Sequence, residues 1–286
     1  MWEHFEKYEN GGISINRQCS FYVGDAAGRI CSSLRGKKDH SAADRLFALN
    51  IGINFFTPEQ YFLKQTHIEN YILPSFSPSL SLDAKLCLFE PEDTAVPGEG
   101  PEVLVFVGYP GSGKSFLANK LARDYGYEIV NRDTLKTWQK CVENAKILLK
   151  RKQSVIVDNT NADAQSRKRF CDVAKSFGAV ARCFVFNCTF EQAAHNCKYR
   201  VIIGTDEAHS DVGRMVLNTY RNKFQDLWLP LELPKLVHLQ NPKAAHLDFQ
   251  EPTLAEGFSS IVRVNFVPEF ACSEHERIYR MYLCDS

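Results

Sequence analysis

The residues best suited to chemistry in this chain form one run, Gly108, Tyr109, Pro110, Gly111, Ser112, Gly113, Lys114 and Ser115. The run fits the pattern of a glycine, four variable residues and Gly-Lys-Ser, in which glycines let backbone N–H groups surround phosphate oxygens. Lys114 can then reach the β- and γ-phosphates of ATP, and the Ser115 hydroxyl can bind Mg²⁺ at the positive end of a helix. An apolar run at 103–107 precedes it and a helical pattern at 116–123 follows it. We therefore predict a strand, a phosphate-binding loop and a helix.

Two acidic residues lie where other predicted strands end. Asp133 follows the predicted strand at 127–130, and Asp158 ends an apolar strand at 154–157. Because open α/β sheets bind ligands at the carboxyl ends of their strands, we expect both carboxylates near the phosphate site. Asp133 is placed to accept a proton from an attacking hydroxyl, and Asp158 to hold Mg²⁺ directly or through water. The alternatives are that Asp133 only caps the following helix and that Asn161 starts the next one.

Basic residues form a second group of candidates. Lys198 and Arg200 end a predicted helix before a segment with little helical pattern. A cation there can close over ATP and neutralise charge on the transferred phosphoryl group, and an exposed helix end is the alternative. Lys136 and Lys140, one helical turn apart, begin a run of cations that reaches Lys152. Such a run can bind a nucleic-acid backbone, although it is more often a solvated face.

Alternating strands and helices must position these residues. After the loop helix the patterns predict a strand at 127–130, a helix at 134–150, a strand at 154–157, a helix at 162–177, a strand at 182–186 and a helix opened by the capping pattern at 189–192. This order predicts an α/β domain of the P-loop NTPase type, with a mostly parallel sheet covered on both faces. A segment rich in proline, serine, glutamate and glycine at 68–100 predicts a linker between residues 1–67 and 101–286.

The composition limits the partners of the chain. Its 286 residues contain 34 lysines and arginines and 34 aspartates and glutamates, so no global field attracts nucleic acid or membranes. The N-terminus has no apolar signal core, and no apolar run approaches the roughly twenty residues that span a bilayer. We therefore expect a soluble, intracellular chain with no membrane partner. The ten cysteines include no Cys-x-x-Cys pair and are expected to be reduced packing residues.

Taken in order, the motifs resemble those of the polynucleotide kinase/phosphatase family, which phosphorylates 5′-hydroxyls and removes 3′-phosphates at DNA ends. The resemblance covers residues 103 to about 267 and includes the segments 131–134, 138–139, 158–161, 191–196, 220–224 and 251–258. It implies that Lys114 and Ser115 bind ATP and metal, that Asp133 is the general base, and that Arg200 is the lid arginine. A nuclear location and a role in DNA repair are implied in the same way.

Residues 1–67 resemble the last part of that family's haloacid-dehalogenase-like phosphatase domain. Asp25, in the segment 21–29, and Asp44, in the segment 41–48, match the acidic region that holds Mg²⁺, for which carboxylates are suitable ligands. The Asp-x-Asp-Gly-Thr segment that bears the phosphatase nucleophile is not found in these 286 residues, nor is the family's forkhead-associated domain for phosphopeptide docking. We therefore expect the 3′-phosphatase activity to be lost.

Residues 226–250 separate two segments that adjoin in the family pattern. They contain prolines at 230, 234 and 242 and an apolar run around Trp228. Proline opposes a continuous helix and the leucines are too apolar for a solvated loop, so we expect a poorly ordered insert. With the late start of the phosphatase resemblance, the insert suggests a truncated or alternatively spliced product.

The sequence thus favours a monomeric kinase that uses ATP and Mg²⁺ to phosphorylate 5′-hydroxyl ends of DNA, with RNA ends as a further candidate substrate. Two alternatives stay open: a small-metabolite P-loop kinase of the same fold, and an inactive fragment that binds nucleotide or DNA. A basic groove leading to Asp133 would favour the polynucleotide kinase over the metabolite kinase.

Overall fold

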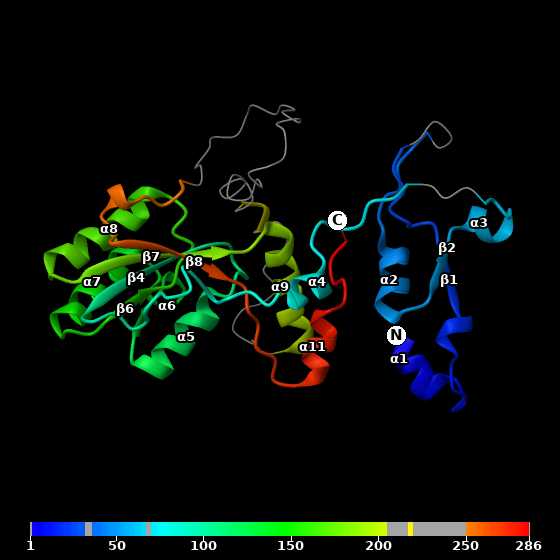
Figure 1. The fold of residues 1–286 in the computed structure, drawn as a ribbon, viewed down its shortest axis with the longest axis horizontal. Coiled ribbons are helices and arrows are strands. Elements are labelled where there is room, and N and C mark those ends of the chain that lie inside the picture. The colour runs from blue at the N-terminus through cyan, green and yellow to red at the C-terminus, as the bar shows by residue number, and fades with distance from the viewer. Residues whose placement is uncertain (1, 32–35, 67–69, 205–216, 220–249, 286) are drawn as a thin grey trace. The chain divides into compact units, whose positions relative to one another are not determined.

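The computed structural model describes residues 2–31, 36–66, 70–204, 217–219 and 250–285. They form two compact units: Met1–Asp83 with Phe270–Ser286, and Ala84–Glu269. The chain therefore leaves the first unit near residue 83 and returns to it near residue 270 (Figure 1). Each unit is described separately below.

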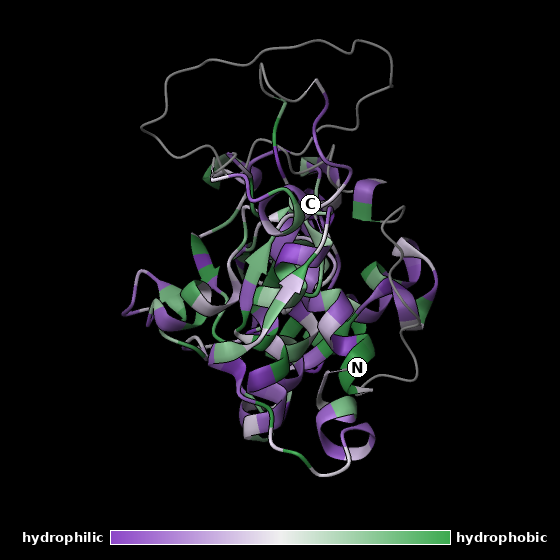
Figure 2. Cartoon of the chain, turned by 90° about the vertical axis from the view of Figure 1, so that its right-hand side faces the viewer, coloured by the Kyte–Doolittle hydropathy of each residue, from purple (hydrophilic) through white to green (hydrophobic). Residues whose placement is uncertain are grey.

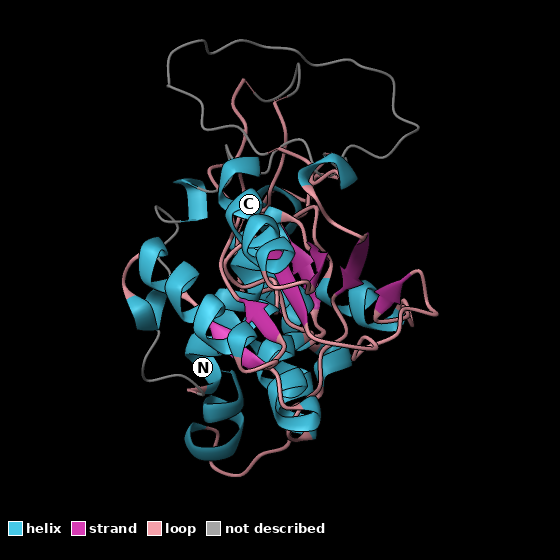
Figure 3. Cartoon of the chain, turned by 90° about the vertical axis from the view of Figure 1, so that its left-hand side faces the viewer, coloured by secondary structure: helices cyan, strands magenta, loops and turns pink. Residues whose placement is uncertain are grey.

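The second unit contains a six-stranded sheet in the order β3 (Phe89–Glu90), β8 (Ser260–Asn265), β7 (Val180–Asn187), β4 (Glu102–Val107), β6 (Val155–Val157) and β5 (Glu128–Val130). Neighbouring strands from β8 to β5 are parallel, and β3 pairs antiparallel with β8 at one edge. Figure 3 shows these strands in magenta among the cyan helices. The predicted P-loop α/β fold with a mostly parallel sheet is confirmed, and strands β3 and β8 are additional to the predicted ones.

The helices of this unit follow the predicted alternation. They are α5 (Lys114–Tyr125), α6 (Arg132–Leu135), α7 (Trp138–Lys150), α8 (Ala164–Ser176) and α9 (Phe190–Ile203), with a short 3₁₀ helix η3 (Leu254–Glu256) before β8. The single helix predicted at 134–150 is divided in two because Lys136 has a positive φ of 69°. An α-helix cannot continue through that conformation.

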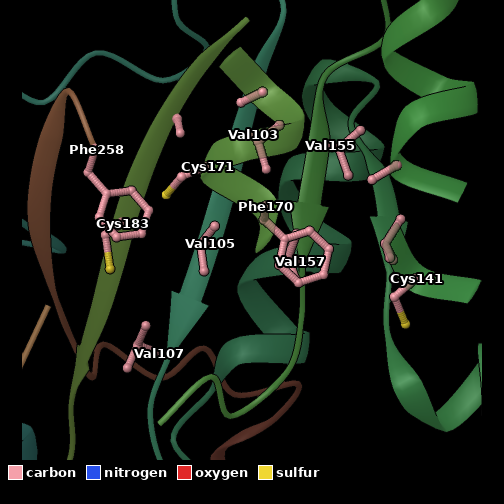
Figure 4. Close-up of a cluster of buried hydrophobic side chains, with 14 of the residues drawn as sticks. Val103, Val105, Val107, Cys141, Val155, Val157, Phe170, Cys171, Cys183 and Phe258 are labelled. Carbon is pink, nitrogen blue, oxygen red and sulfur yellow. The ribbon is translucent and has the colours of Figure 1, made fainter. Parts of the chain in front are cut away.

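Alternate residues of β4 face two different cores, as the period of a strand requires. Val103, Val105 and Val107 pack with buried residues of α7 and α8, while Leu104 and Phe106 pack with α5. Figure 4 shows the first of these cores, with the valines of β4 and β6 close to Phe170 of α8. A strand that is buried on both faces reads as a continuous apolar run, and the strands of the sheet are accordingly mostly green in Figure 2.

The first unit is built around a short parallel pair, β1 (Phe21–Val23) and β2 (Asn54–Phe56). Its helical segments are α1 (Trp2–His4), η1 (Phe5–Glu9), η2 (Arg17–Cys19), α2 (Ala43–Ile51), α3 (Pro58–Phe62), α4 (Pro78–Asp83) and α11 (Ser273–Tyr279). Buried Arg29 pairs with Asp39 at 2.8 Å and with Glu59 at 2.9 Å. Near the C-terminus, Tyr282 exchanges two backbone hydrogen bonds with the Asn50 side chain.

The segment expected to be a linker, 68–100, is part of both units instead. Residues 70–72 bond back to Gly28 and Ile30, α4 lies in the first unit, and β3 extends the sheet of the second. Residues 226–249 of the expected insert lie outside the described residues, whereas Gln250 is described. The domain expected at 101–286 therefore differs from the compact unit Ala84–Glu269 at both ends.

The cysteines were expected to be packing residues, and half of them are buried. Five are buried: Cys141, Cys171, Cys183, Cys188 and Cys197. Cys19, Cys31, Cys87 and Cys272 are exposed and Cys284 is half-buried, and none of the ten forms a disulfide. Within the part of the chain that the structure describes, no helix has the length and apolar character needed to cross a membrane.

Candidate active site

The loop between β4 and α5 has the backbone of a phosphate-binding loop. Gly111 and Gly113 have φ values of 82° and 94°, which residues with a side chain rarely adopt. A Cβ on Gly111 would lie 2.7 Å from the Ala193 carbonyl oxygen, and one on Gly108 would lie 2.9 Å from the Phe186 Cβ. Backbone conformation and close packing therefore both require glycine in this loop.

Lys114 is the first residue of α5 and is buried, with 7% of its surface exposed. Its Nζ donates hydrogen bonds to the carbonyl oxygens of Gly108 and Tyr109, at 3.0 and 2.6 Å. Burial lowers the pKa of this amine to about 8, and the attraction of Asp158 opposes the shift. Phosphate oxygens would give the amine anionic partners, and charge-assisted bonds of that kind are stronger than bonds to carbonyl groups. Ser115 follows at the exposed start of the helix.

The ends of β4, β5 and β6 are hydrogen-bonded together beside the loop. The Asp158 N–H donates to the Val130 carbonyl at 3.0 Å, and the Gly108 N–H donates to the Thr160 carbonyl at 3.3 Å. Asp158 is buried, with 8% of its surface exposed, and its charge acts on Lys114. The structure thus brings Asp158 close to the glycine loop and to Lys114.

Asp133 lies in α6 and is exposed. Asn131 caps α6 by accepting a hydrogen bond from the Thr134 N–H at 2.9 Å, and Thr137 caps α7. The alternative in which Asp133 serves only as the helix cap is therefore wrong. The Asn159 Oδ1 accepts a hydrogen bond from the Arg132 N–H at 2.9 Å, which ties the Asp133 segment to the loop that follows Asp158.

Asn161 has a structural task different from the one considered in the sequence. Asp163 starts α8, because its carboxylate accepts the Ser166 N–H bond at 2.7 Å. Asn161 is buried, has a left-handed φ of 45°, and donates from Nδ2 to the Phe106 carbonyl at 2.7 Å. This bond lies one residue before the end of β4, so Asn161 braces the entry to the glycine loop.

Helix α9 packs directly on the glycine loop. The Asn196 Nδ2 donates to the Gly111 carbonyl oxygen at 2.8 Å. One turn later, the half-buried Arg200 donates to the Cys197 Sγ at 3.6 Å, while its Nε is buried with no hydrogen-bond partner among the described residues. Repulsion from Arg200 also contributes to the lowered pKa of Lys114, after burial. A buried guanidinium nitrogen without an acceptor is costly, and an anionic ligand would supply one.

The surface beside Asp133 carries an aromatic ring and several cations. Trp138 is 41% exposed at the start of α7, and the Arg169 guanidinium of α8 lies 4.2 Å from its ring centroid. Lys136 and Lys140 are exposed, and the Lys136 Nζ donates to the Asp133 carbonyl at 2.6 Å. The sequence predicted that Lys136 and Lys140 lie one turn apart on a single helix. Lys136 instead terminates α6, and Lys140 belongs to α7.

The acidic residues of the first unit lie close to each other. Asp44 lies in the first turn of α2, where its Oδ2 accepts the Ala26 N–H bond at 2.9 Å and its Oδ1 accepts the Tyr22 hydroxyl bond at 3.2 Å. Asp25 is exposed on the adjoining loop. Both Asp44 oxygens already accept bonds within the unit, and Mg²⁺ binding by Asp25 and Asp44 stays a prediction.

The residues at the nucleotide loop fit a Mg²⁺ ion. No group of three histidine, cysteine, aspartate or glutamate side chains able to hold a metal occurs among the described residues. Mg²⁺ does not require such a cage, because it is commonly held by one or two protein oxygens together with phosphate oxygens and water. The buried Asp158 carboxylate and the exposed Ser115 hydroxyl supply oxygens of the right kind.

Two family profiles match the chain. Polynucleotide kinase 3 phosphatase matches residues 1–62, and an AAA domain matches residues 103–144 and 135–227. A bifunctional polynucleotide phosphatase/kinase of Schizosaccharomyces pombe is 34% identical over 277 residues, which are 93% of this chain and 55% of that protein. A candidate enzyme of the same kind from Acanthamoeba polyphaga mimivirus is 35% identical over 226 residues, 72% of this chain and 51% of that protein. The resemblance to polynucleotide kinase/phosphatases is confirmed.

This chain spans about half the length of these two relatives. Among solved structures, a gluconokinase from Sinorhizobium meliloti is 17% identical, with a TM-score of 0.30 over 43% of this chain and 74% of that one. The two profile matches place a phosphatase-type segment before the P-loop domain, in the order that the sequence predicted.

Sequence reasoning missed several residues that build this site. Asn196 and Arg167 support the glycine loop and the turn at Asn161, yet neither was a candidate. Arg167 is fully buried in the first turn of α8, which is an unusual position for a cation, and no local sequence pattern marks it. Its carboxylate partner, Glu256, lies 89 residues away and could not be inferred from local pattern.

Proposed function

We propose that this chain transfers the γ-phosphoryl group of ATP to 5′-hydroxyl ends of DNA, with RNA ends as a further acceptor. The observation that carries the proposal is the position of Asp133. Its exposed carboxylate has no role as a helix cap, and its segment is fixed to the Asp158 loop by the Asn159–Arg132 hydrogen bond. The kinase/phosphatase relatives support a polynucleotide as the acceptor.

The reaction assigns a separate task to each residue. Backbone N–H groups of the glycine loop and the Lys114 amine bind the phosphates of ATP. Asp133 accepts the proton of the acceptor hydroxyl as the oxygen attacks the γ-phosphorus; the new oxygen–phosphorus bond forms, the β–γ bridging bond breaks, and ADP leaves. The Arg200 guanidinium, whose Nε has no hydrogen-bond partner in the described part of the chain, stabilises charge on the transferred group. Mg²⁺, held by Ser115 and Asp158, would neutralise charge on the phosphate oxygens when bound.

The acceptor strand would lie along the surface of α7 and α8. Trp138 offers an exposed ring on which a base can stack, and the Arg169 guanidinium makes a cation–π contact with that ring. Lys136 and Lys140 supply local positive charge, as a chain of zero net charge requires for a polyanionic substrate. A small metabolite would need neither the aromatic platform nor the cations.

The deciding experiment is transfer of labelled γ-phosphate to a 5′-hydroxyl DNA oligonucleotide, with an RNA oligonucleotide, thymidine and gluconate as competing acceptors. Label on the oligonucleotides supports the proposal. Label on thymidine or gluconate alone would show a metabolite kinase. No label on any acceptor, with a melting temperature that rises on addition of Mg·ATP, would show a nucleotide-binding fragment without activity.

We also propose a nuclear location for the chain, consistent with action on DNA ends. Fluorescence microscopy of the tagged chain tests it, and cytoplasmic signal alone would contradict it. We propose a monomer, which sedimentation of the purified protein tests directly.

A further inference from the structure

We infer that Arg167 and Glu256 are positioning residues for the metal and ATP site, because their ion pair fixes the turn that carries Asp158. The inference rests on the proposed function and concerns the same site. It adds the segment 250–256, which lies outside the glycine loop and its neighbouring strand ends, to the machinery that holds ATP and Mg²⁺.

Arg167 uses its whole guanidinium group in this task. It is fully buried, and its Nε and Nη2 donate to the two carboxylate oxygens of Glu256 at 2.8 and 2.7 Å. Its Nη1 donates to the carbonyl oxygens of Asn161 and Ala162, both at 3.1 Å. A planar guanidinium held by two carboxylate bonds presents its remaining nitrogen in a fixed direction, which a lysine cannot do.

Gln250 binds the same turn independently. Its backbone N–H donates to the Ala162 carbonyl at 3.1 Å, and its side-chain oxygen accepts the Ala164 N–H bond at 2.9 Å. Glu256 also accepts the Thr253 N–H bond at 3.1 Å, which closes the capping box of η3. Both ends of the segment 250–256 therefore support the turn: Gln250 bonds to it directly, and Glu256 holds the Arg167 side chain that bonds to it.

The turn at Asn161 is hydrogen-bonded to the start of the glycine loop. Asn161 donates to the Phe106 carbonyl and Thr160 accepts the Gly108 N–H bond, so one turn contacts both sides of the entry to the glycine loop. Asp158 precedes Asn161 by three residues on the same segment. Because misplacement by about 1 Å can cost roughly a hundredfold in rate, loss of this support would displace the metal ligand enough to be measured.

The unit contains a matched control pair. Arg182 donates to Glu102 through Nε and Nη2, at 2.6 and 2.9 Å, and the two side chains are only 11% and 2% exposed. Glu102 is the first residue of β4, at the end of the strand opposite the glycine loop. The pairs are alike in chemistry and burial, but only Arg167–Glu256 touches the turn at Asn161.

The test compares Arg167→Lys and Glu256→Gln with Arg182→Lys and Glu102→Gln. Titration calorimetry measures Mn²⁺ binding in the presence of a non-hydrolysable ATP analogue, and kinase assays give the half-saturating Mg²⁺ concentration. We expect all four variants to lower the melting temperature. Only the first two should weaken Mn²⁺ binding and raise the Mg²⁺ requirement, by about 10- to 100-fold, the usual effect of removing support from a metal ligand.

Equal metal affinity in all four variants would overturn the inference and leave Arg167–Glu256 as a purely structural pair. If the Arg167 and Glu256 variants do not fold, Gln250→Ala decides, since Gln250 is exposed and its side chain contributes a single bond. Unchanged Mn²⁺ binding in that variant would then refute the inference, and weaker binding would support it. The binding measurement needs no acceptor, so failure to phosphorylate a polynucleotide would contradict the proposed function without affecting this result.

Discussion

Replacement of Asp133 by alanine should separate catalysis from stability. A general base contributes about 10²- to 10⁴-fold to the rate, which corresponds to roughly 2.7 to 5.4 kcal/mol of activation free energy. The carboxylate is exposed, and Asn131 and Thr137 cap the neighbouring helices. The free energy of unfolding should therefore change by less than about 1 kcal/mol.

The assay combines steady-state transfer of the γ-phosphoryl group with calorimetric binding of ATP. We expect kcat to fall by the factor above while ATP affinity stays near that of the wild type, because the proposed mechanism assigns Asp133 to the acceptor rather than to the nucleotide. Asp133→Asn, which keeps the shape of the side chain but cannot accept the proton, should lose activity to a similar degree.

Asn131→Ala is the matched control for the helix. Loss of its cap bond to the Thr134 N–H should lower the free energy of unfolding by about 1 kcal/mol while the carboxylate of Asp133 remains. If Asp133→Ala had the same kcat as the wild type, or if its effect appeared only as lost stability, the assignment of the general base would be refuted.

Three further predictions follow from the site. Because burial lowers the pKa of Lys114 to about 8, ATP binding at pH 8.5 should take up protons and should weaken as the pH rises. Calorimetry in buffers of different ionisation enthalpy measures the proton uptake, which Lys114→Arg should abolish. Deletion of 226–249 should preserve kinase activity and raise the melting temperature, whereas deletion of 226–250 also removes the Gln250 bonds and should weaken Mn²⁺ binding. A polypeptide of residues 1–286 should release no more phosphate from a 3′-phosphorylated oligonucleotide than its Asp25→Ala variant; faster release would contradict the expected loss of phosphatase activity.

The glycine loop and the central strands could be predicted because their signals are local. Apolar runs such as 103–107 and 155–157 identify strands buried on both faces, and the glycine spacing identifies the loop between strand and helix. The carboxyl ends of parallel strands then meet at one edge. From this rule alone, the sequence predicts that Asp133 and Asp158 lie near the phosphate site.

Local preference failed where two residues competed for one task. Asn131 and Asp133 are both good helix caps, and so are Asn161 and Asp163. Backbone context decided between them: Asn131 and Asp163 have extended backbones, whereas Asn161 is left-handed and turns its amide toward β4. The positive φ of Lys136, which divides the predicted helix, was equally hidden, because lysine has no preference for that conformation.

Pairings between residues far apart in the chain could not be predicted from the sequence, for a different reason. Strand β3 has only two residues and exists because it pairs with β8, which lies far along the chain. The ion pair of Arg167 with Glu256 joins residues 89 positions apart. Neither partner has a periodic pattern that marks the other, so only the folded chain reveals them.

The chain path limits how this protein can be truncated without disturbing its first unit. The first unit is closed by residues 270–286, in which Tyr279 is buried, Tyr282 bonds to Asn50, and the Asp285 carboxylate accepts the Ala42 N–H bond at 3.1 Å. Truncation near residue 269 would spare the kinase-type unit and strip these contacts from the phosphatase-type unit. A C-terminal truncation would therefore disturb the first unit as well as remove residues, and point substitutions such as Asp133→Ala and Asp25→Ala are the better means of testing each unit separately.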